Sequence, residues 1–94
     1  MRIVTVTTAT PAVLTSSGSN YVNSGAFNIP CTVAAIPGGG GGSLLVEYQV
    51  VPSGSWTAWP ASTVTTKTVY VLNGPVHALR FTATTANGTV EITQ

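Results

Sequence analysis

The chain has 94 residues, of which 44% are hydrophobic and only 5% are charged, and its formal net charge is +1. Three basic side chains cannot neutralise enough phosphates for useful nucleic-acid affinity, and no apolar run approaches the roughly 20 residues of a membrane span. Neither nucleic acid nor a membrane is therefore expected as a partner, and the length predicts a single domain, residues 1–94, with one core.

The scarcity of charge is the most informative feature of the composition. Charged residues make up about 25% of an average globular protein, whereas this chain has only Arg2, Lys67, Arg80, Glu47 and Glu91. Its surface must therefore consist largely of Thr, Ser, Gly and Asn, which suits packing against other protein better than long-range steering. The lone cysteine excludes an internal disulfide and the N-terminus lacks a secretory signal, so synthesis in a reducing cytoplasm is expected.

The N-terminal quarter is predicted to contain a strand followed by loops. Residues 2–8 are rich in Val, Ile and Thr and are predicted to form a strand. Residues 1–10 as a whole are either a strand of the domain or an arm that pairs with a neighbouring chain. Residues 12–25 contain dense polar turn formers, which predict loops around a brief strand near Tyr21 and Val22.

The middle of the chain is predicted to contain two strands joined by glycines. Residues 26–36 alternate apolar and polar side chains and are predicted to form one strand, in which Pro30 indicates an edge or a bulge. Gly38–Gly42 are five consecutive glycines, which predict a flexible connection. Residues 44–51 alternate strongly and predict a strand with one apolar face.

The next extended stretch is residues 63–72, which are rich in Thr and Val. Asn73 and Gly74 then indicate a turn. The pairing across this turn stays open, because Pro75 follows it directly and could shift the register.

The clearest prediction is an antiparallel hairpin over residues 76–94. Apolar and polar residues alternate on both sides of Asn87 and Gly88, the preferred central residues of a two-residue hairpin turn. In that register Ala83 faces Ile92. The buried face would then comprise Phe81, Ala83, Val90 and Ile92. Since no segment carries a helical stripe, about six to seven short strands indicate an all-β fold, a small antiparallel β-sandwich or barrel.

Catalytic residues are not expected. A dyad of Cys31 and His77 is disfavoured because the chain has no Asp, and a buried strand cysteine is the better interpretation. Glu47 and Glu91 could form a carboxylate pair for glycoside hydrolysis, but both occupy outward strand positions and are interpreted as solvated or interface side chains. No second His or Asp completes a metal site with His77, and the glycine run lacks the residues of a phosphate-binding loop. No metal or cofactor is therefore expected.

Trp56 and Trp59 are the strongest binding candidates, because aromatic pairs beside a turn stack on sugars or anchor protein interfaces. Residues three apart in a strand face opposite sides, so one tryptophan is predicted in the core and the other at the rim. A protein contact is favoured over a sugar, because nearby acidic and amide groups that could hold hydroxyls are sparse. Together with Arg2 and Arg80, the two tryptophans are the predicted protein-interface residues.

The second half of the chain carries recognisable motifs in four segments. These are residues 44–50 (LLVEYQV), 55–60 (SWTAWP), 71–82 (VLNGPVHALRFT) and 88–92 (GTVEI). This half resembles small virion proteins of tailed bacteriophages, in which a strand ending in a polar turn, a Trp-x-x-Trp segment, an Ala-Leu-Arg strand and a terminal Gly-Thr-Val-Glu strand recur. The resemblance covers about half of the chain, and it implies a virion component that is not an enzyme.

Among such components, the resemblance implies a capsid decoration (cement) protein that binds the major capsid protein on the head exterior and stabilises the head. Such proteins are often trimers or dimers, so self-association is also expected. A neutral surface suits a module that adds to a lattice through many weak contacts. Two alternatives remain: a tail or head-tail component of the same fold, and a carbohydrate-binding or adhesin module that would use Trp56, Trp59 and Tyr48.

Overall fold

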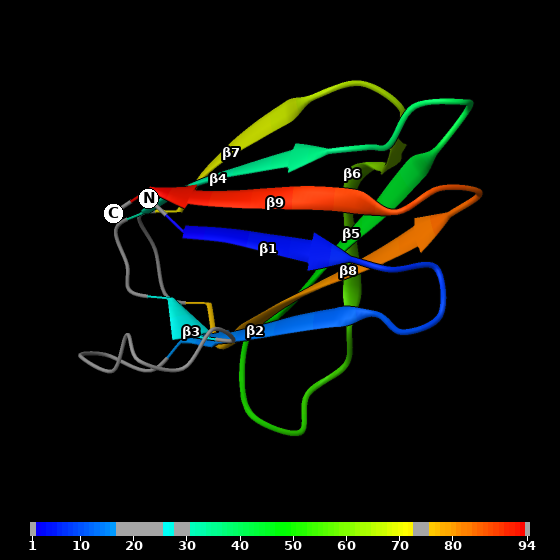
Figure 1. Cartoon of the computed structure of the whole chain (residues 1–94). Helices are drawn as coiled ribbons and strands as arrows, with labels where there is room; N and C mark the ends of the chain where they lie inside the picture. Colours follow the sequence, from blue (N-terminus) through cyan, green and yellow to red (C-terminus); the bar gives the residue numbers. More distant parts are fainter. Residues whose placement is uncertain (1, 17–25, 28–30, 73–75, 94) are drawn as a thin grey trace.

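The computed structural model describes residues 2–16, 26–27, 31–72 and 76–93. These residues form nine strands and no helix, and so include no helix that could span a membrane (Figure 1). The strands are β1 (Arg2–Val6), β2 (Ala12–Ser16), β3 (Ala26–Phe27), β4 (Cys31–Ile36), β5 (Ser43–Gln49), β6 (Thr57–Val64), β7 (Thr68–Leu72), β8 (Ala78–Thr84) and β9 (Gly88–Thr93). The predicted all-β sandwich is confirmed, with more strands than the six or seven expected.

The strands form two sheets packed face to face. The four-stranded sheet has the order β1-β9-β4-β7, and the five-stranded sheet has the order β3-β2-β8-β5-β6. All pairings are antiparallel except the short parallel pairing of β2 with β3. In Figure 1 the four strands β1, β9, β4 and β7 lie in one layer, and β2, β8, β5 and β6 lie in the other.

The pairings are nested along the chain. β5 pairs with β6, β4 with β7, β2 with β8, and β1 with β9. The chain therefore runs inward to the β5–β6 hairpin and returns alongside itself as a long antiparallel ribbon. The β4–β9 and β5–β8 pairings fold that ribbon into two sheets. Eight strands arranged in this way form a jelly roll, here with the short β3 added at one edge.

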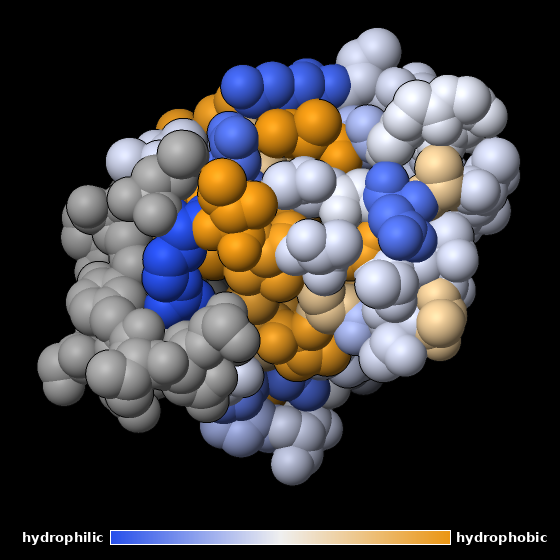
Figure 2. Space-filling view, in the orientation of Figure 1, coloured by the Kyte–Doolittle hydropathy of each residue, from blue (hydrophilic) through white to orange (hydrophobic). Residues whose placement is uncertain are grey.

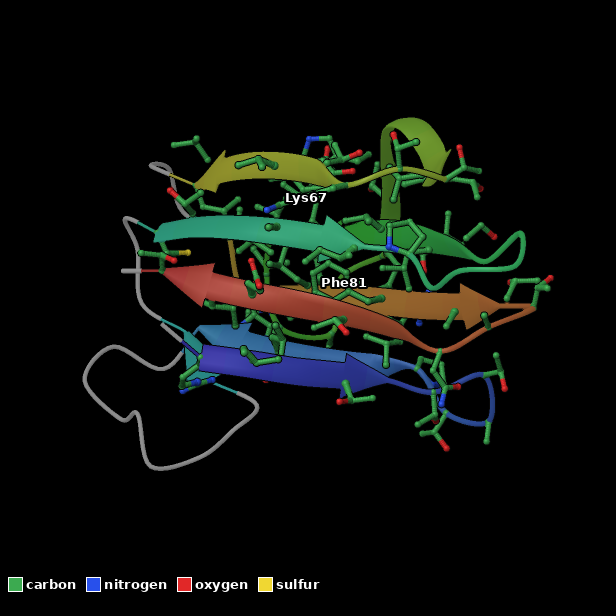
Figure 3. The ribbon with its side chains drawn as sticks, turned by 45° about the horizontal axis from the view of Figure 1, so that its top comes forward. Lys67 and Phe81 are labelled. Atoms are coloured by element: carbon green, nitrogen blue, oxygen red, sulfur yellow. The ribbon has the colours of Figure 1, made fainter. Side chains whose placement is uncertain are left out.

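The core lies between the two sheets. Each strand contributes alternate side chains to it, because successive residues of a strand point to opposite faces. Phe81 of β8, which is 0% exposed, lies between the layers in Figure 3. The other large side chains that are fully buried are Leu14, Leu44, Leu79, Ile92, Val6, Val33, Val46 and Val90. Both sheets therefore contribute to one continuous apolar layer.

The predicted C-terminal hairpin is wrong, although its two strands and its buried residues are right. β8 pairs with β2 and β5 in one sheet, whereas β9 pairs with β1 and β4 in the other. Ala83 and Ile92 both reach the core, but from opposite sheets and not as cross-strand neighbours. Asn87 and Gly88 also lack the positive φ that a type I′ turn requires, and Thr85, with a φ of 76°, is the left-handed residue of this connection.

β2 was also missed by the sequence prediction. Residues 12–16 were expected to be loop, because the polar residues after them dominate the local pattern. In the structure they pair with the central strand β8, and Leu14 is buried in the core. The brief strand expected near Tyr21 and Val22 lies outside the described residues.

Two stretches that were predicted to be single strands are each divided between the sheets. Residues 26–36 supply β3 and β4, and residues 63–72 supply the end of β6 and the whole of β7. Pro30 and the turn at residues 73–75 lie outside the described residues. Residues 1–10 contain a strand of the domain, since β1 pairs with β9 of the same chain.

The glycine run makes a defined turn between β4 and β5. Gly40 and Gly41 have φ values of 73° and 86°, which residues with a Cβ rarely adopt. Gly38 packs so closely on the carbonyl oxygen of Asn87 that any side chain would overlap it. The glycines therefore meet steric requirements of this turn as well as connecting the two sheets.

Candidate protein interface

One group of side chains on the outer face of the five-stranded sheet combines an arginine, a glutamate and a tryptophan. In the β2–β8 and β8–β5 pairings, Val13 lies opposite Arg80, and Arg80 lies opposite Glu47. Arg80 stands between the buried residues Leu79 and Phe81, so its side chain points away from the core. We call this group the tryptophan face; it comprises Val13, Glu47, Trp56 and Arg80.

Arg80 and Glu47 form the closest ion pair of this face. The Nε of Arg80 donates a hydrogen bond to Oε1 of Glu47 over 2.9 Å. The two side chains are 31% and 15% exposed, so solvent screens the pair only in part. Because the residues lie directly opposite each other, the sheet itself sets this geometry and the charge of the face is neutralised locally.

Trp56 packs against the guanidinium group of this pair. Its ring centroid lies 4.5 Å from Cζ of Arg80, which is a cation–π distance. Trp56 directly precedes β6, at the end of a connection held by two hydrogen bonds. The Gly54 N–H donates to the carbonyl of Val51 over 3.0 Å, and Nε2 of Gln49 donates to the carbonyl of Gly54 over 2.8 Å. The guanidinium is therefore held between a carboxylate and an indole before any partner binds.

Trp59 lies within β6 and faces the opposite way from Trp56. Its ring contacts Tyr48 of β5 at a centroid distance of 4.9 Å and Tyr70 of β7 at 4.8 Å. These tyrosines belong to different sheets, so Trp59 connects the sheets where their edge strands β6 and β7 meet. It packs against the core, and burial raises the pKa of the Tyr70 hydroxyl. The prediction that the two tryptophans face opposite sides is confirmed, and only Trp56 belongs to the outer face.

Arg2 does not belong to this surface either. It begins β1 in the four-stranded sheet, is half-buried and lies opposite Ile92. Arg2 and Val6 are an even number of residues apart in β1, so their side chains point to the same side of the sheet. Val6 is fully buried, and Arg2 therefore lies on the inner side of β1. Of the four predicted interface residues, the structure brings Trp56 and Arg80 together and places the other two elsewhere.

The outer face of the four-stranded sheet exposes apolar side chains that the sequence prediction missed. Ile3, Val69 and Val71 are 62%, 54% and 68% exposed. The charged residues of this side are Lys67, labelled in Figure 3, and Glu91, with Nζ and Oε1 4.0 Å apart. In the view of Figure 2, exposed hydrophobic residues form a band across the middle of the molecule. The sequence of β7 could have predicted this exposed apolar surface, because apolar residues occupy both its inward and its outward positions.

The residues considered for catalysis are not brought together. Cys31 is 4% exposed, and burial raises the pKa of its thiol, which disfavours the reactive thiolate and confirms it as a buried strand cysteine. Glu47 and Glu91 lie on the outer faces of different sheets and cannot act as a carboxylate pair. His77 is half-buried, and its backbone N–H donates to the carbonyl of Gln49 over 2.8 Å, which extends the β5–β8 ladder. The described residues contain no group of three or more His, Cys, Asp or Glu that could hold a metal ion.

We compared the chain with models of protein families, with curated proteins and with solved structures. None of these comparisons finds a match.

Proposed function

We propose that this protein is a structural component of a bacteriophage virion, a decoration protein that binds the outside of the major capsid lattice and stabilises the head. After synthesis in the host cytoplasm it would reside on the head exterior. Two features support the proposal: the virion-protein motifs in the second half of the sequence, and the jelly-roll arrangement of the strands, an architecture used in viral capsid and lectin domains.

The observation that carries the proposal is that each outer face pairs its own charges. Arg80 lies against Glu47 on the five-stranded sheet, and Lys67 lies near Glu91 on the four-stranded sheet. The chain has only five charged side chains, and the fifth, Arg2, lies on the inner side of β1 and adds no charge to either outer face. Both outer faces therefore offer apolar and hydroxyl groups with little net charge. Such a surface suits close packing on a protein lattice, where many modest contacts add up.

The tryptophan face is the part of the surface that would contact the capsid. Tryptophan and arginine are the residue types that most often dominate binding energy at protein interfaces. Here Trp56 and Arg80 already hold each other at 4.5 Å, so little side-chain entropy is lost on binding. Glu47 accepts a hydrogen bond from the same guanidinium, so burying Arg80 under a capsid subunit would not leave its charge unpaired.

The test is whether purified protein rebinds expanded phage heads that lack it. Bound copies would be measured by sedimentation of the heads at increasing protein concentration, at low and at moderate salt. We expect saturable binding at defined lattice positions, with an affinity that changes little with salt because few charges are available to screen. Failure to bind, or a steep loss of binding at moderate salt, would overturn the proposal.

Two variants test which outer face of the sandwich contacts the capsid. Trp56→Ala should weaken head binding about tenfold or more. Ile3→Ala, at a residue 62% exposed on the opposite face, should leave binding unchanged. If Ile3→Ala weakens binding and Trp56→Ala does not, the capsid contact lies on the four-stranded sheet and the tryptophan face is excluded.

The alternatives are separated by other measurements. Genes for a capsid protease and a major capsid protein beside the gene for this chain favour decoration, whereas neighbouring tail genes favour a tail or head-tail component. The carbohydrate-binding alternative receives less support from the structure, because Trp59 packs against the core and one side of Trp56 is covered by Arg80. Glycan-array binding that is lost in Trp56→Ala would favour that alternative.

A further inference from the structure

The four edge strands of the sandwich are not equally protected against pairing with another chain. Natural sheets protect their edges with charges, prolines, bulges or very short strands. In the described part of the chain β3 spans two residues, β6 contains Pro60 within a shifted register, and β1 carries Arg2. β7, Thr68–Leu72, has the sequence TVYVL and a continuous register with β4, and it contains none of these protective features.

β7 also combines a fixed inner side with an exposed outer side. Leu72 is buried, and Tyr70 packs on the ring of Trp59, so the strand is held firmly in the sheet. Val69 and Val71 are 54% and 68% exposed on the outer face. Among the described residues, β7 is the last strand of its sheet, at the upper edge in Figure 1, and no described strand pairs with the backbone N–H and C=O groups of its outer edge.

We propose that two copies of this protein associate through β7, edge to edge and antiparallel, to form one continuous eight-stranded sheet from their two four-stranded sheets. Each copy contributes the same edge, so the two copies are related by a two-fold axis. The β7 edge of each copy is then paired, and no further copy can add there. A closed pair also removes the aggregation hazard that an unprotected edge presents.

The sequence of β7 sets the register of this pairing. Opposed residues in an antiparallel pair lie on the same face, so outward valines must face outward valines. Centring the axis on Tyr70 meets this condition and pairs all five residues of the strand. Val69 of one copy then lies opposite Val71 of the other, as a cross-strand pair of β-branched side chains.

The charges near β7 are compatible with this arrangement. Lys67 lies three residues from the axis, so the two copies of Lys67 would be about 20 Å apart along the strands. That separation exceeds the Debye length of about 8 Å at physiological salt, so the like charges do not oppose association. The strand itself carries no charge.

The first test is the mass of the protein in solution. The chain has a mass of 9.6 kDa, and we expect sedimentation equilibrium to show a reversible species of twice that mass. The interface is one short strand, so the dissociation constant should be weak, on the order of tens of micromolar. A protein that stays monomeric up to millimolar concentration, or that forms open-ended polymers, would overturn the proposal.

Charge variants at Val71 test whether β7 is the interface. In the proposed register the two copies of residue 71 are diagonal neighbours about 7–8 Å apart, within the Debye length. Val71→Lys and Val71→Glu should each weaken association at least tenfold, and an equimolar mixture of the two should restore it as a heterodimer. Ile3→Lys, a matched exposed position on β1, should leave association unchanged. Unimpaired association of Val71→Lys, or loss of association in Ile3→Lys, would contradict the proposal.

Cysteine variants test the register. Directly opposed residues have Cα atoms about 4.5–5.5 Å apart, within disulfide range, whereas the diagonal pair is not. A mixture of Val69→Cys and Val71→Cys should therefore give a disulfide-linked dimer on oxidation, and neither variant alone should do so. Cross-linking of either variant alone that is as efficient as cross-linking of the mixture would exclude this register. The tryptophan face takes no part in this pairing, so capsid binding and self-association can fail independently.

Discussion

Gly88 lies directly against the side chain of Leu44. A Cβ at position 88 would be 2.8 Å from Cδ2 of Leu44 and 3.1 Å from the carbonyl oxygen of Ile36. Leu44 is 0% exposed and stands at the start of β5 in the opposite sheet, so at Gly88 the backbone of β9 packs directly on a core side chain of the other layer. The glycine is required here for close packing, and not for a left-handed turn conformation.

Replacing Gly88 with Ala should therefore destabilise the protein by about 1–3 kcal/mol, because the added methyl group overpacks the core against Leu44. Gly39→Ala is the matched control. A Cβ there meets nothing within 4 Å, and its φ is not positive, so the change should be neutral or slightly stabilising. Urea unfolding of both variants measures the difference. Equal free energies of unfolding would show that the contact at position 88 relaxes without cost.

The pair Asn87-Gly88 is the reason why the C-terminal hairpin was predicted wrongly. Asn-Gly between two alternating segments is a strong local signal for a tight hairpin. In a jelly roll, however, strands that follow one another in sequence usually belong to different sheets, and the hydrogen-bonded partners are far apart along the chain. The alternation still predicted which residues are buried, because both Phe81 and Ile92 face the core whichever strand they pair with.

The left-handed conformation in the β8–β9 connection falls on Thr85, whose φ is 76°. A β-branched residue is strained there by about 1–2 kcal/mol relative to glycine. Replacing it with glycine relieves this strain, but the extra entropy of glycine in the unfolded chain offsets part of the stabilisation. Thr85→Gly should therefore stabilise the protein by about 0.5–1 kcal/mol, and raise the Tm by a few degrees. Thr84→Gly, at the end of β8, should lower the Tm instead. A lower Tm in both variants would mean that Thr85 contributes contacts worth more than its strain.

The candidate site was predictable only in part. The spacing of Trp56 and Trp59 was sufficient to predict that they face opposite sides, because side-chain direction in extended chain alternates with sequence distance, and Trp56 directly precedes β6. That Arg80 lies between Glu47 and Trp56 depends on the β5–β8 register and on the connection before β6, which are long-range features. The unprotected edge of β7 could not be predicted from the sequence either, because only the sheet order shows which strands lie at an edge.

The two tryptophans should differ sharply in their contribution to stability. Trp59→Ala removes the ring that joins Tyr48 of one sheet to Tyr70 of the other, and should cost about 3 kcal/mol of unfolding free energy. Trp56→Ala removes a ring on the outer face and should cost about 1 kcal/mol or less. Denaturant unfolding followed by circular dichroism compares the two. Similar losses would mean that Trp56 supports the fold as much as Trp59 does, which would weaken its assignment to binding.

Burial of Cys31 and Tyr70 should make the free energy of unfolding fall at alkaline pH. Burial raises the pKa of the thiol above its ordinary value of 9.0 and the pKa of the phenol above 10.0, so each group keeps its proton longer in the folded state than in the unfolded state. Their contributions to stability are therefore fully present below about pH 8, and are lost as the pH rises through these ordinary values and beyond.

Urea unfolding between about pH 7 and pH 10.5 should show this decline, since the unfolded state binds fewer protons than the folded state in that window. Cys31→Ala should flatten the curve near pH 9, and addition of Tyr70→Phe should flatten it near pH 10. A thiol-reactive dye should modify Cys31 slowly in the folded protein and rapidly in urea, because the sulfur lies in the core. Rapid labelling of the folded protein, or an unchanged alkaline slope in the double variant, would show that these groups titrate freely.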